Sequence, residues 1–306
     1  MRIGFIGVGN IGRGMAEHLL RAGHDLVVHD LREEAVNALR ASGARAGGSS
    51  RAVAEECEVV VTCLPGPPEM EHVVLGPGGL LEGLRPGALY VDHTTNSPAL
   101  VRRVHATLAA RGVAMVDAPV SGGMEGARTR DLLVMAGGDR AAFERARPVL
   151  ETMAKRVLYA GAIGSGSVCK LMHNCASFTL DLVMAECWTV GVKAGVTPDT
   201  IVDAFRNAAL GHMMSLKVRL PATYLQGDFA PRFSLNLARK DLGLALELAR
   251  ASEVPMRFGA LCEQEMIEAL ARGWGERDSS IAMTLQEERA GVQVRLATGG
   301  PPAAGA

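Results

Sequence analysis

The sequence predicts an α/β domain built on a doubly wound, mostly parallel sheet, followed by an all-α domain. Up to about Val157, short apolar runs alternate with segments of helical periodicity, which is the pattern of repeated βαβ units. Beyond Gly166 the β-rich runs disappear and long helical patterns follow one another. The chain has 306 residues, so a prior of one domain per roughly 150 residues also predicts two domains.

Strands are expected in the first half where apolar runs end in turn signals, at 2–6, 26–30, 58–63, 88–92, 113–117, 132–136 and 156–159. Helix signals fill the connections between them: Met15, Leu19 and Ala22 recur at helical spacing, and Ser97-Pro98 opens another helix. In the second half, helices are expected at 167–194, 198–208, 212–226, 234–252, 256–272 and 278–291.

These patterns divide the chain into a dinucleotide-binding domain over 1–163 and a helical domain over 164–295. Residues 296–306 have no apolar face to bury and are expected to form a disordered tail. The long apolar helix near 167–194 is expected to connect the domains and to meet a partner subunit. A homodimer or homotetramer is therefore expected.

Composition argues against several classes of protein. The net charge is −1 with no basic stripe, which argues against nucleic-acid or membrane-surface binding. No apolar run reaches the roughly 20 residues of a membrane span, and the chain begins at once with a strand pattern, so a cytoplasmic location is expected. The six cysteines form no Cys-x-x-Cys pair and the eight histidines no His-x-x-x-His pair, so free thiols and no metal are expected.

A glycine-rich motif after the first strand indicates a dinucleotide. Its residues are Gly7, Gly9, Asn10, Ile11 and Gly12, where glycines permit a tight turn and let backbone N–H groups approach a pyrophosphate.

Asp30 closes the second strand, where a carboxylate can accept hydrogen bonds from the adenosine ribose. An alternative is that Asp30 caps the following helix, with Glu33 three residues on. A carboxylate here would repel the 2′-phosphate of NADP, so NAD is favoured. Arg32 nearby could relax this choice, and NADP is not excluded.

Later strand ends carry further candidate ligands, because ligands collect at the carboxyl ends of parallel strands. Leu64-Pro65 and Thr94-Thr95 follow two of these strands. After a third, Ser121 offers a hydroxyl, and Gly122 and Gly123 expose backbone N–H groups that can cradle a carboxylate. The same stretch is also typical of an ordinary turn.

Lys170 is the candidate acid/base, in place of a metal or a histidine. It follows the glycine-rich turn at 161–166 that marks the expected domain junction, and interdomain clefts are preferred sites for small ligands. Asn174 lies four residues on and shares its helix face, so the pair can hold one small substrate. The alternative is a solvated lysine beside an asparagine that bonds its own helix.

Five motifs in order over nearly the whole chain resemble the β-hydroxyacid dehydrogenase family, which includes 3-hydroxyisobutyrate dehydrogenase and tartronate semialdehyde reductase. They are GVGNIG, Leu64-Pro65, DAPVSGG, GSGSVCKLMHN and Phe233 with Arg239-Lys240-Asp241-Leu242. The family fold, a Rossmann domain and then a helical domain, agrees with the pattern above. The resemblance implies catalytic Lys170, substrate-orienting Asn174, a substrate site at Ser121, Gly122, Gly123 and Phe233, and cofactor contacts from Leu64, Pro65, Thr95 and Lys240.

The chain also departs from the family pattern. His173 stands where members commonly have Asn, Arg130-Asp131 where they have Gly-Thr, and Ile11 where they have Met. The first two departures leave the substrate's identity open. His173 is either a packing or surface residue or a substrate contact.

The expected function is NAD(P)-dependent interconversion of a small 3-hydroxy carboxylic acid and its semialdehyde or 3-oxo acid. Hydride would pass to or from the nicotinamide while Lys170 handles the proton on oxygen. One alternative is a ketone or imine reductase on the same scaffold, in which an acidic or phenolic residue generally replaces the lysine. Another is a non-catalytic cofactor-binding module. The substituent at C2 of the substrate is left open.

Overall fold

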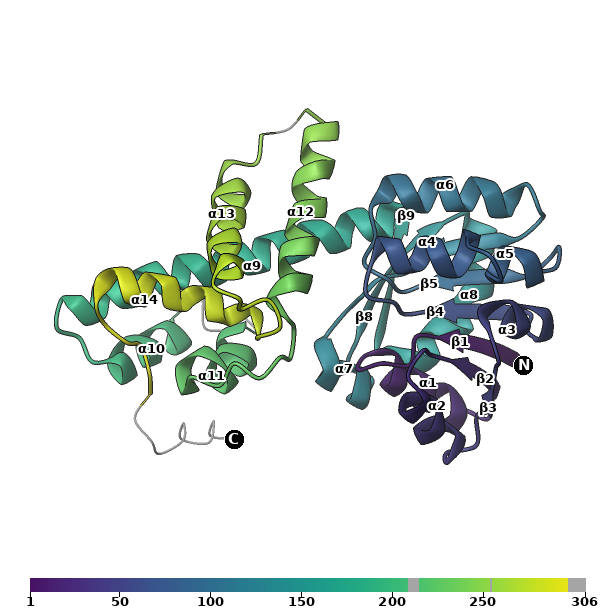
Figure 1. The fold of residues 1–306 in the computed structure, drawn as a ribbon, viewed down its shortest axis with the longest axis horizontal. Helices are drawn as coiled ribbons and strands as arrows, with labels where there is room; N and C mark the ends of the chain where they lie inside the picture. Colours follow the sequence, from purple (N-terminus) through teal and green to yellow (C-terminus); the bar gives the residue numbers. More distant parts are fainter. Residues whose placement is uncertain (209–214, 254, 297–306) are drawn as a thin grey trace. The chain divides into compact units, whose positions relative to one another are not determined.

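The computed structural model describes residues 1–208, 215–253 and 255–296 (Figure 1). The chain divides into two compact units, Met1–Met172 and His173–Ala306. The division falls inside the long helix α9 (Ser165–Lys193), whereas the expected domain boundary at 163/164 lies just before this helix.

The first unit contains a nine-stranded sheet. Its strands are β1 (Arg2–Ile6), β2 (Asp25–His29), β3 (Arg45–Ala46), β4 (Val59–Thr62), β5 (Leu89–Asp92), β6 (Ala114–Asp117), β7 (Val120–Ser121), β8 (Leu133–Gly138) and β9 (Arg156–Gly161). All seven expected strands occur, with ends within two residues of the expected ones. The two further strands, β3 and β7, are too short to show a periodicity.

The strand order is β3-β2-β1-β4-β5-β6-β8-β7, and β9 pairs with β8. Pairing is parallel from β3 through to β6, and again between β8 and β9. Strand β8 runs antiparallel to both β6 and β7. The prediction of a mostly parallel, doubly wound sheet is confirmed, and the carboxyl ends of β1, β2, β4, β5 and β6 share one edge.

Helices cover both faces of this sheet (Figure 1). They are α1 (Gly12–Arg21), α2 (Glu33–Arg40), α3 (Ser50–Glu56), α4 (Pro67–Leu75), α5 (Leu80–Gly83), α6 (Pro98–Ala109), α7 (Gly123–Thr129) and α8 (Arg140–Met153). Successive strand residues enter opposite cores: Phe5 and Val91 pack with α1, α2 and α8, while Val60 and Tyr90 pack with α3 to α6. Burial on both faces explains why these strands read as continuous apolar runs.

Among its described residues, the second unit contains helices and no strand apart from an isolated bridge between Ser234 and Asp278, as expected for a helical domain. After α9 come α10 (Pro198–Asn207), a π-helical turn η2 (Ser215–Arg219), α11 (Leu220–Ala222), a 3-10 turn η3 (Tyr224–Gln226), α12 (Leu235–Ala251), α13 (Arg257–Ala271), a 3-10 turn η4 (Ser279–Met283) and α14 (Thr284–Ala290). Its core gathers around Trp188 and Tyr224, whose rings stack 6.0 Å apart.

Two expectations for this unit need correction or restriction. The single helix expected over 212–226 is wrong: residues 215–226 form three short helical pieces of different type. Pro221 lacks the N–H that a continuing helix needs, and Thr223 leaves helical geometry at φ −123° and ψ −94°. The expected disordered tail was 296–306. Its first residue, Leu296, is ordered, since its N–H donates to the Leu225 carbonyl at 3.0 Å, and the remaining residues lie outside the described ranges. No helix in the described ranges is long and apolar enough to cross a membrane.

Candidate cofactor and catalytic site

The glycine turn between β1 and α1 requires glycine for steric reasons. Gly7 has φ +85°, and a Cβ added to it would lie 2.4 Å from the Cys63 carbonyl oxygen. A Cβ on Gly12 would lie 2.0 Å from the Gly7 carbonyl oxygen. Helix α1 begins at Gly12 with no side-chain cap at Ile11 and no acidic residue in its first turn. Its first N–H groups therefore suit an anion such as a pyrophosphate.

Asp30, which follows β2, holds this turn in place. Its Oδ2 accepts a hydrogen bond from the Val8 N–H at 2.9 Å, and its Oδ1 accepts one from the Arg32 N–H at 2.9 Å. The alternative role as a helix cap is wrong, because α2 begins at Glu33 and its N-cap residue is Arg32. The Asp30 side chain keeps 11% of its surface exposed. A carboxylate at the end of β2 is thus fixed beside the glycine turn.

A buried carboxylate joins the loops after β4 and β5. Asp92 accepts hydrogen bonds from the Thr62 hydroxyl at 2.8 Å, the Thr94 N–H at 3.0 Å and the Asn96 amide at 2.8 Å. The Thr94 hydroxyl in turn accepts the Leu64 N–H at 3.1 Å. Burial raises the pKa of Asp92 above its ordinary value. The loops that carry the predicted cofactor contacts Leu64-Pro65 and Thr95 are therefore bonded through Thr94, which is held by Asp92, a residue that no local sequence pattern indicated.

Two glycines after β7, at the start of α7, have backbone conformations that favour glycine. Gly122 has φ +139° and Gly123 has φ +65°, and a Cβ on Gly122 would lie 2.7 Å from the Asp131 carbonyl oxygen. Both glycines are exposed and Ser121 is half-buried. Directly after β6, the Ala118 carbonyl accepts a hydrogen bond from Nδ1 of His93 at 2.5 Å, and burial lowers the pKa of His93 to about 4, so its ring is neutral.

In the second unit, Asp241 brings together two residues that the sequence analysis assigned to different roles. The Asn174 side-chain amide donates to Asp241 Oδ2 at 2.6 Å, and the Lys240 ammonium lies 2.5 Å from Asp241 Oδ1. Asn174 is 6% exposed, and its amide is fixed by helix α12 and not by its own helix backbone. His173 is exposed, with Nδ1 3.1 Å from the Asn174 side-chain oxygen.

Both backbone polar groups of Phe233 are hydrogen-bonded. Its N–H donates to Asp278 Oδ2 at 3.2 Å, and its carbonyl accepts from the Ser279 N–H at 2.8 Å. Its ring stacks on Phe178, with centroids 5.6 Å apart and planes inclined by 22°. Phe178 lies one helical turn beyond Asn174 on α9.

The predicted site residues fall into two groups, one in each unit. The first unit holds Gly7, Gly9, Asn10, Ile11, Gly12, Asp30, Leu64, Pro65, Thr95, Ser121, Gly122, Gly123 and Lys170, and the second holds Asn174, Phe233 and Lys240. Lys170 and Asn174 are nevertheless close neighbours, since they are one turn apart on the same continuous helix. The meeting of the two groups around one substrate is a prediction of the sequence analysis.

Family models match two consecutive stretches of the chain. Residues 2–161 match the NAD-binding domain of 6-phosphogluconate dehydrogenase, and residues 164–285 match a domain described as NAD-binding of NADP-dependent 3-hydroxyisobutyrate dehydrogenase. The 2-(hydroxymethyl)glutarate dehydrogenase of Eubacterium barkeri is 34% identical over 294 residues, covering 96% of this chain and 97% of that protein. The chain belongs to the 3-hydroxyisobutyrate dehydrogenase family.

Other members of the 3-hydroxyisobutyrate dehydrogenase family agree in sequence and in fold. The NAD-dependent L-serine dehydrogenase of Pseudomonas aeruginosa is 37% identical, covering 93% of this chain and 97% of that protein. A crystal structure of 3-hydroxyisobutyrate dehydrogenase from Salmonella typhimurium superposes with a TM-score of 0.84 at 30% identity, covering 93% and 99% of the two chains. The predicted family, the Rossmann and helical architecture and the NAD(P)-dependent oxidoreductase class are confirmed.

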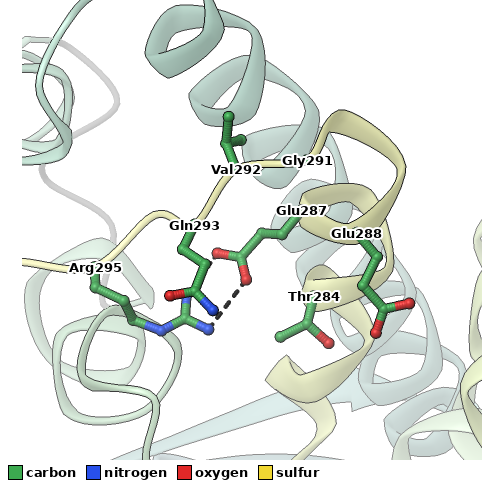
Figure 2. Close-up of a pocket in the computed structure, with 7 residues that line it drawn as sticks. All are labelled: Thr284, Glu287, Glu288, Gly291, Val292, Gln293 and Arg295. Carbon is green, nitrogen blue, oxygen red and sulfur yellow. Dashed lines mark hydrogen bonds and ion pairs between the residues drawn. The ribbon is translucent and has the colours of Figure 1, made fainter.

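A surface pocket in the second unit is lined by none of the predicted site residues. It is lined by Thr284, Glu287, Glu288, Gly291, Val292, Gln293 and Arg295. Figure 2 shows the Arg295 guanidinium turned toward the Glu287 carboxylate, and Nη2 lies 3.0 Å from Oε2. Glu287 and Arg295 are thus paired within the pocket, Glu288 pairs with Arg272 outside it, and no residue predicted to bind cofactor or substrate contributes to it. Among the described residues, no group of three or more His, Cys, Asp or Glu could hold a metal ion.

Proposed function

We propose that this protein is an NAD(P)-dependent dehydrogenase that interconverts a small 3-hydroxy carboxylate and its semialdehyde or 3-oxo acid, with Lys170 as general acid/base. The observation that carries this proposal is the pair Lys170 and Asn174 on α9, with the Asn174 amide fixed by Asp241. L-Serine and 2-(hydroxymethyl)glutarate, which name two relatives, each carry a primary alcohol on the carbon beta to a carboxylate. The proposed substrate shares that unit.

In the proposed mechanism, residues of the first unit bind the cofactor and the substrate carboxylate and move the proton. A bound nicotinamide supplies or accepts the hydride. The N–H groups at the start of α1 would hold the pyrophosphate, and Ser121, Gly122 and Gly123 would bind the substrate carboxylate. In the reducing direction the Lys170 ammonium stabilises the charge that develops on the carbonyl oxygen and then protonates it. In the oxidising direction its neutral amine accepts the hydroxyl proton.

A panel of 3-hydroxy acids and their semialdehydes tests this function. The panel should vary the C2 substituent among hydrogen, methyl, hydroxyl, amino and carboxyethyl. Cofactor-dependent absorbance is expected to change with at least one member and not with the matching 2-hydroxy acids, because only the former place the alcohol one carbon away from the carboxylate-bearing carbon. Absence of any change across the panel would contradict the proposal.

NAD is the proposed cofactor of choice. The Asp30 carboxylate beside the glycine turn would repel a 2′-phosphate and can accept hydrogen bonds from ribose hydroxyls. Arg32 is the residue that could oppose this preference. Its Nη2 lies 2.9 Å from where a Cβ on Gly9 would stand, and its Nε lies 3.4 Å from Asp30 Oδ1. The guanidinium is thus close enough to the turn to meet a 2′-phosphate once Asp30 no longer carries a charge.

Asp30→Asn is expected to shift the ratio of kcat/KM for NAD over NADP by about tenfold or more toward NADP, since a hydrogen bond to a charged group contributes roughly 1.5–3 kcal/mol. Steady-state rates with each cofactor at fixed substrate measure it. Asp25→Asn is the matched control, because Asp25 is an exposed carboxylate at the opposite end of β2, paired with Arg2 and Arg45. An unchanged ratio in Asp30→Asn would remove Asp30 from cofactor selection.

The proposal includes a cytoplasmic homodimer or homotetramer. Helix α9 exposes two large apolar side chains, Met172 and Val183, while other residues of the same helix lie in the core of the second unit. Such exposed apolar residues support an association between subunits along this helix.

A further inference from the structure

A buried carboxylate at the end of β6 is bonded to the start of α9, the helix that carries Lys170. Asp117 is fully buried. Its Oδ1 accepts the Gly164 N–H at 2.7 Å, and its Oδ2 accepts the Ser167 N–H at 2.8 Å and the Ser167 hydroxyl at 3.0 Å. Because α9 begins at Ser165, these donors lie on both sides of the helix start. Asp117, 50 residues before Ser167, thus caps the N-terminus of α9.

The backbone of Gly137 and Gly166 lies so close to this carboxylate that a side chain at either position would collide with it or with neighbouring backbone. A Cβ on Gly137, the residue paired with Asp117 across the sheet, would lie 2.5 Å from Asp117 Oδ1. A Cβ on Gly166 would lie 3.1 Å from Asp117 Oδ2 and 2.2 Å from the Met135 carbonyl oxygen. The first turn of α9 therefore approaches the sheet as closely as two glycines allow, and the Asp117 carboxylate fixes where the helix starts.

The start of α9 determines the place of Lys170. Ser167 and Lys170 are three residues apart, so their side chains are neighbours on the helix surface and their Cα atoms differ by about 4.5 Å along the axis. Asp117 is also the last residue of β6, four residues before Ser121 at the end of β7, and Gly122 and Gly123 follow at the start of α7. One carboxylate thus joins the segment proposed to bind the substrate carboxylate to the helix proposed to supply the proton. Misplacement of a reacting group by about 1 Å can cost about 10²-fold in rate.

We propose that Asp117 is a positioning residue for Lys170, acting through its hydrogen bonds to the first turn of α9. This proposal rests on the proposed function, because it requires Lys170 to be the acid/base.

The charged surroundings of Asp117 make its role depend on pH. Burial, with a smaller contribution from the Asp92 carboxylate, raises the pKa of Asp117 to about 6 against the opposing effect of the hydrogen bonds from Gly164 and Ser167. His93, after β5, is neutral in this range, and the Arg102 guanidinium on α6 stands beside Gly164. Above pH 6 both Asp117 oxygens accept hydrogen bonds. Below pH 6, one Asp117 oxygen carries a proton that faces an N–H group and opposes the hydrogen bond from that group.

Asp117→Asn is the test, since it keeps the shape but turns one acceptor into a donor. At pH 8 we expect kcat for carbonyl reduction to fall about tenfold or more, while the Kd for NAD stays within about twofold. As pH falls through 6, the wild-type kcat should decline toward that of the variant, and the variant should show no decline there. Asp25→Asn, an exposed carboxylate in the same unit, should keep both the wild-type kcat and the wild-type pH profile.

The outcomes separate this proposal from the proposed function. If Lys170→Ala retains its turnover, the proposed function fails whatever Asp117 does. If Lys170→Ala is inactive while Asp117→Asn keeps the wild-type kcat and its decline below pH 6, only the positioning role fails. An equal loss of NAD affinity and kcat in Asp117→Asn also overturns the positioning role. Should Asp117→Asn not fold, Ser167→Ala removes a single hydrogen bond and should lower kcat about threefold at constant NAD affinity; an unchanged kcat overturns the proposal.

Discussion

Lys170→Ala is expected to lower kcat by at least about two orders of magnitude in both directions, the usual scale of a general acid/base. The affinity for NAD should stay the same, because the glycine turn and Asp30 that are proposed to hold the cofactor are distant in sequence and complete without this side chain. Steady-state kinetics give kcat, and titration of NAD by protein fluorescence gives Kd. A variant with normal turnover would end the assignment of Lys170.

One further variant separates proton transfer from charge, and a second is a control for the helix. Lys170→Arg keeps the positive charge but cannot release a proton in the accessible pH range, so alcohol oxidation should be nearly as slow as in Lys170→Ala. Lys193→Ala is the matched control on the same helix, since Lys193 lies at its other end and donates to the Ala290 carbonyl at 2.9 Å. Its kcat should remain within about twofold of wild type. Equal losses in the Lys170 and Lys193 variants would indicate damage to α9 instead of lost chemistry.

The fold could be predicted because its signals are local. Strands buried on both faces read as apolar runs, and α6 and α10 begin at Ser97-Pro98 and Thr197-Pro198, where the hydroxyl caps the helix as the sequence indicates. What local patterns could not show were β3 and β7, each two residues long, and the change of helix type over 215–226. Those depend on neighbouring strands and on packing around Tyr224, which no short window of sequence contains.

The candidate site divides in the same way. The glycine turn could be predicted because its backbone conformation admits no side chain at Gly7 and Gly12. The carboxylates that support the site were missed because their partners are far along the chain: Asp117 bonds Ser167, 50 residues away, and Asp241 bonds Asn174, 67 residues away. The sequence does hold one usable signal, since an acidic residue that closes an apolar strand, as Asp117 does, needs a buried partner.

Gly12→Ala is expected to weaken NAD binding by at least about tenfold and to destabilise the first unit by about 1–3 kcal/mol, the usual cost of overpacking. The added methyl would lie 2.0 Å from the Gly7 carbonyl oxygen and 3.1 Å from the Phe5 ring. Neither neighbour can move aside, since the Gly7 N–H is bonded to the His29 carbonyl at 2.9 Å and Phe5 is fully buried. Helix α1 must shift instead, and its first N–H groups shift with it.

Calorimetric titration with NAD measures the loss of NAD affinity in Gly12→Ala. Urea unfolding measures its loss of stability separately. Gly48→Ala is the control, because a Cβ there meets nothing within 4 Å and the backbone is outside the left-handed region. Gly9→Ala distinguishes lost binding from lost folding: its methyl would meet only the mobile end of Arg32, 2.9 Å away, so the fold should survive. NAD affinity should still fall, because the methyl stands where the pyrophosphate approaches the backbone. Wild-type affinity in both variants would place the cofactor elsewhere.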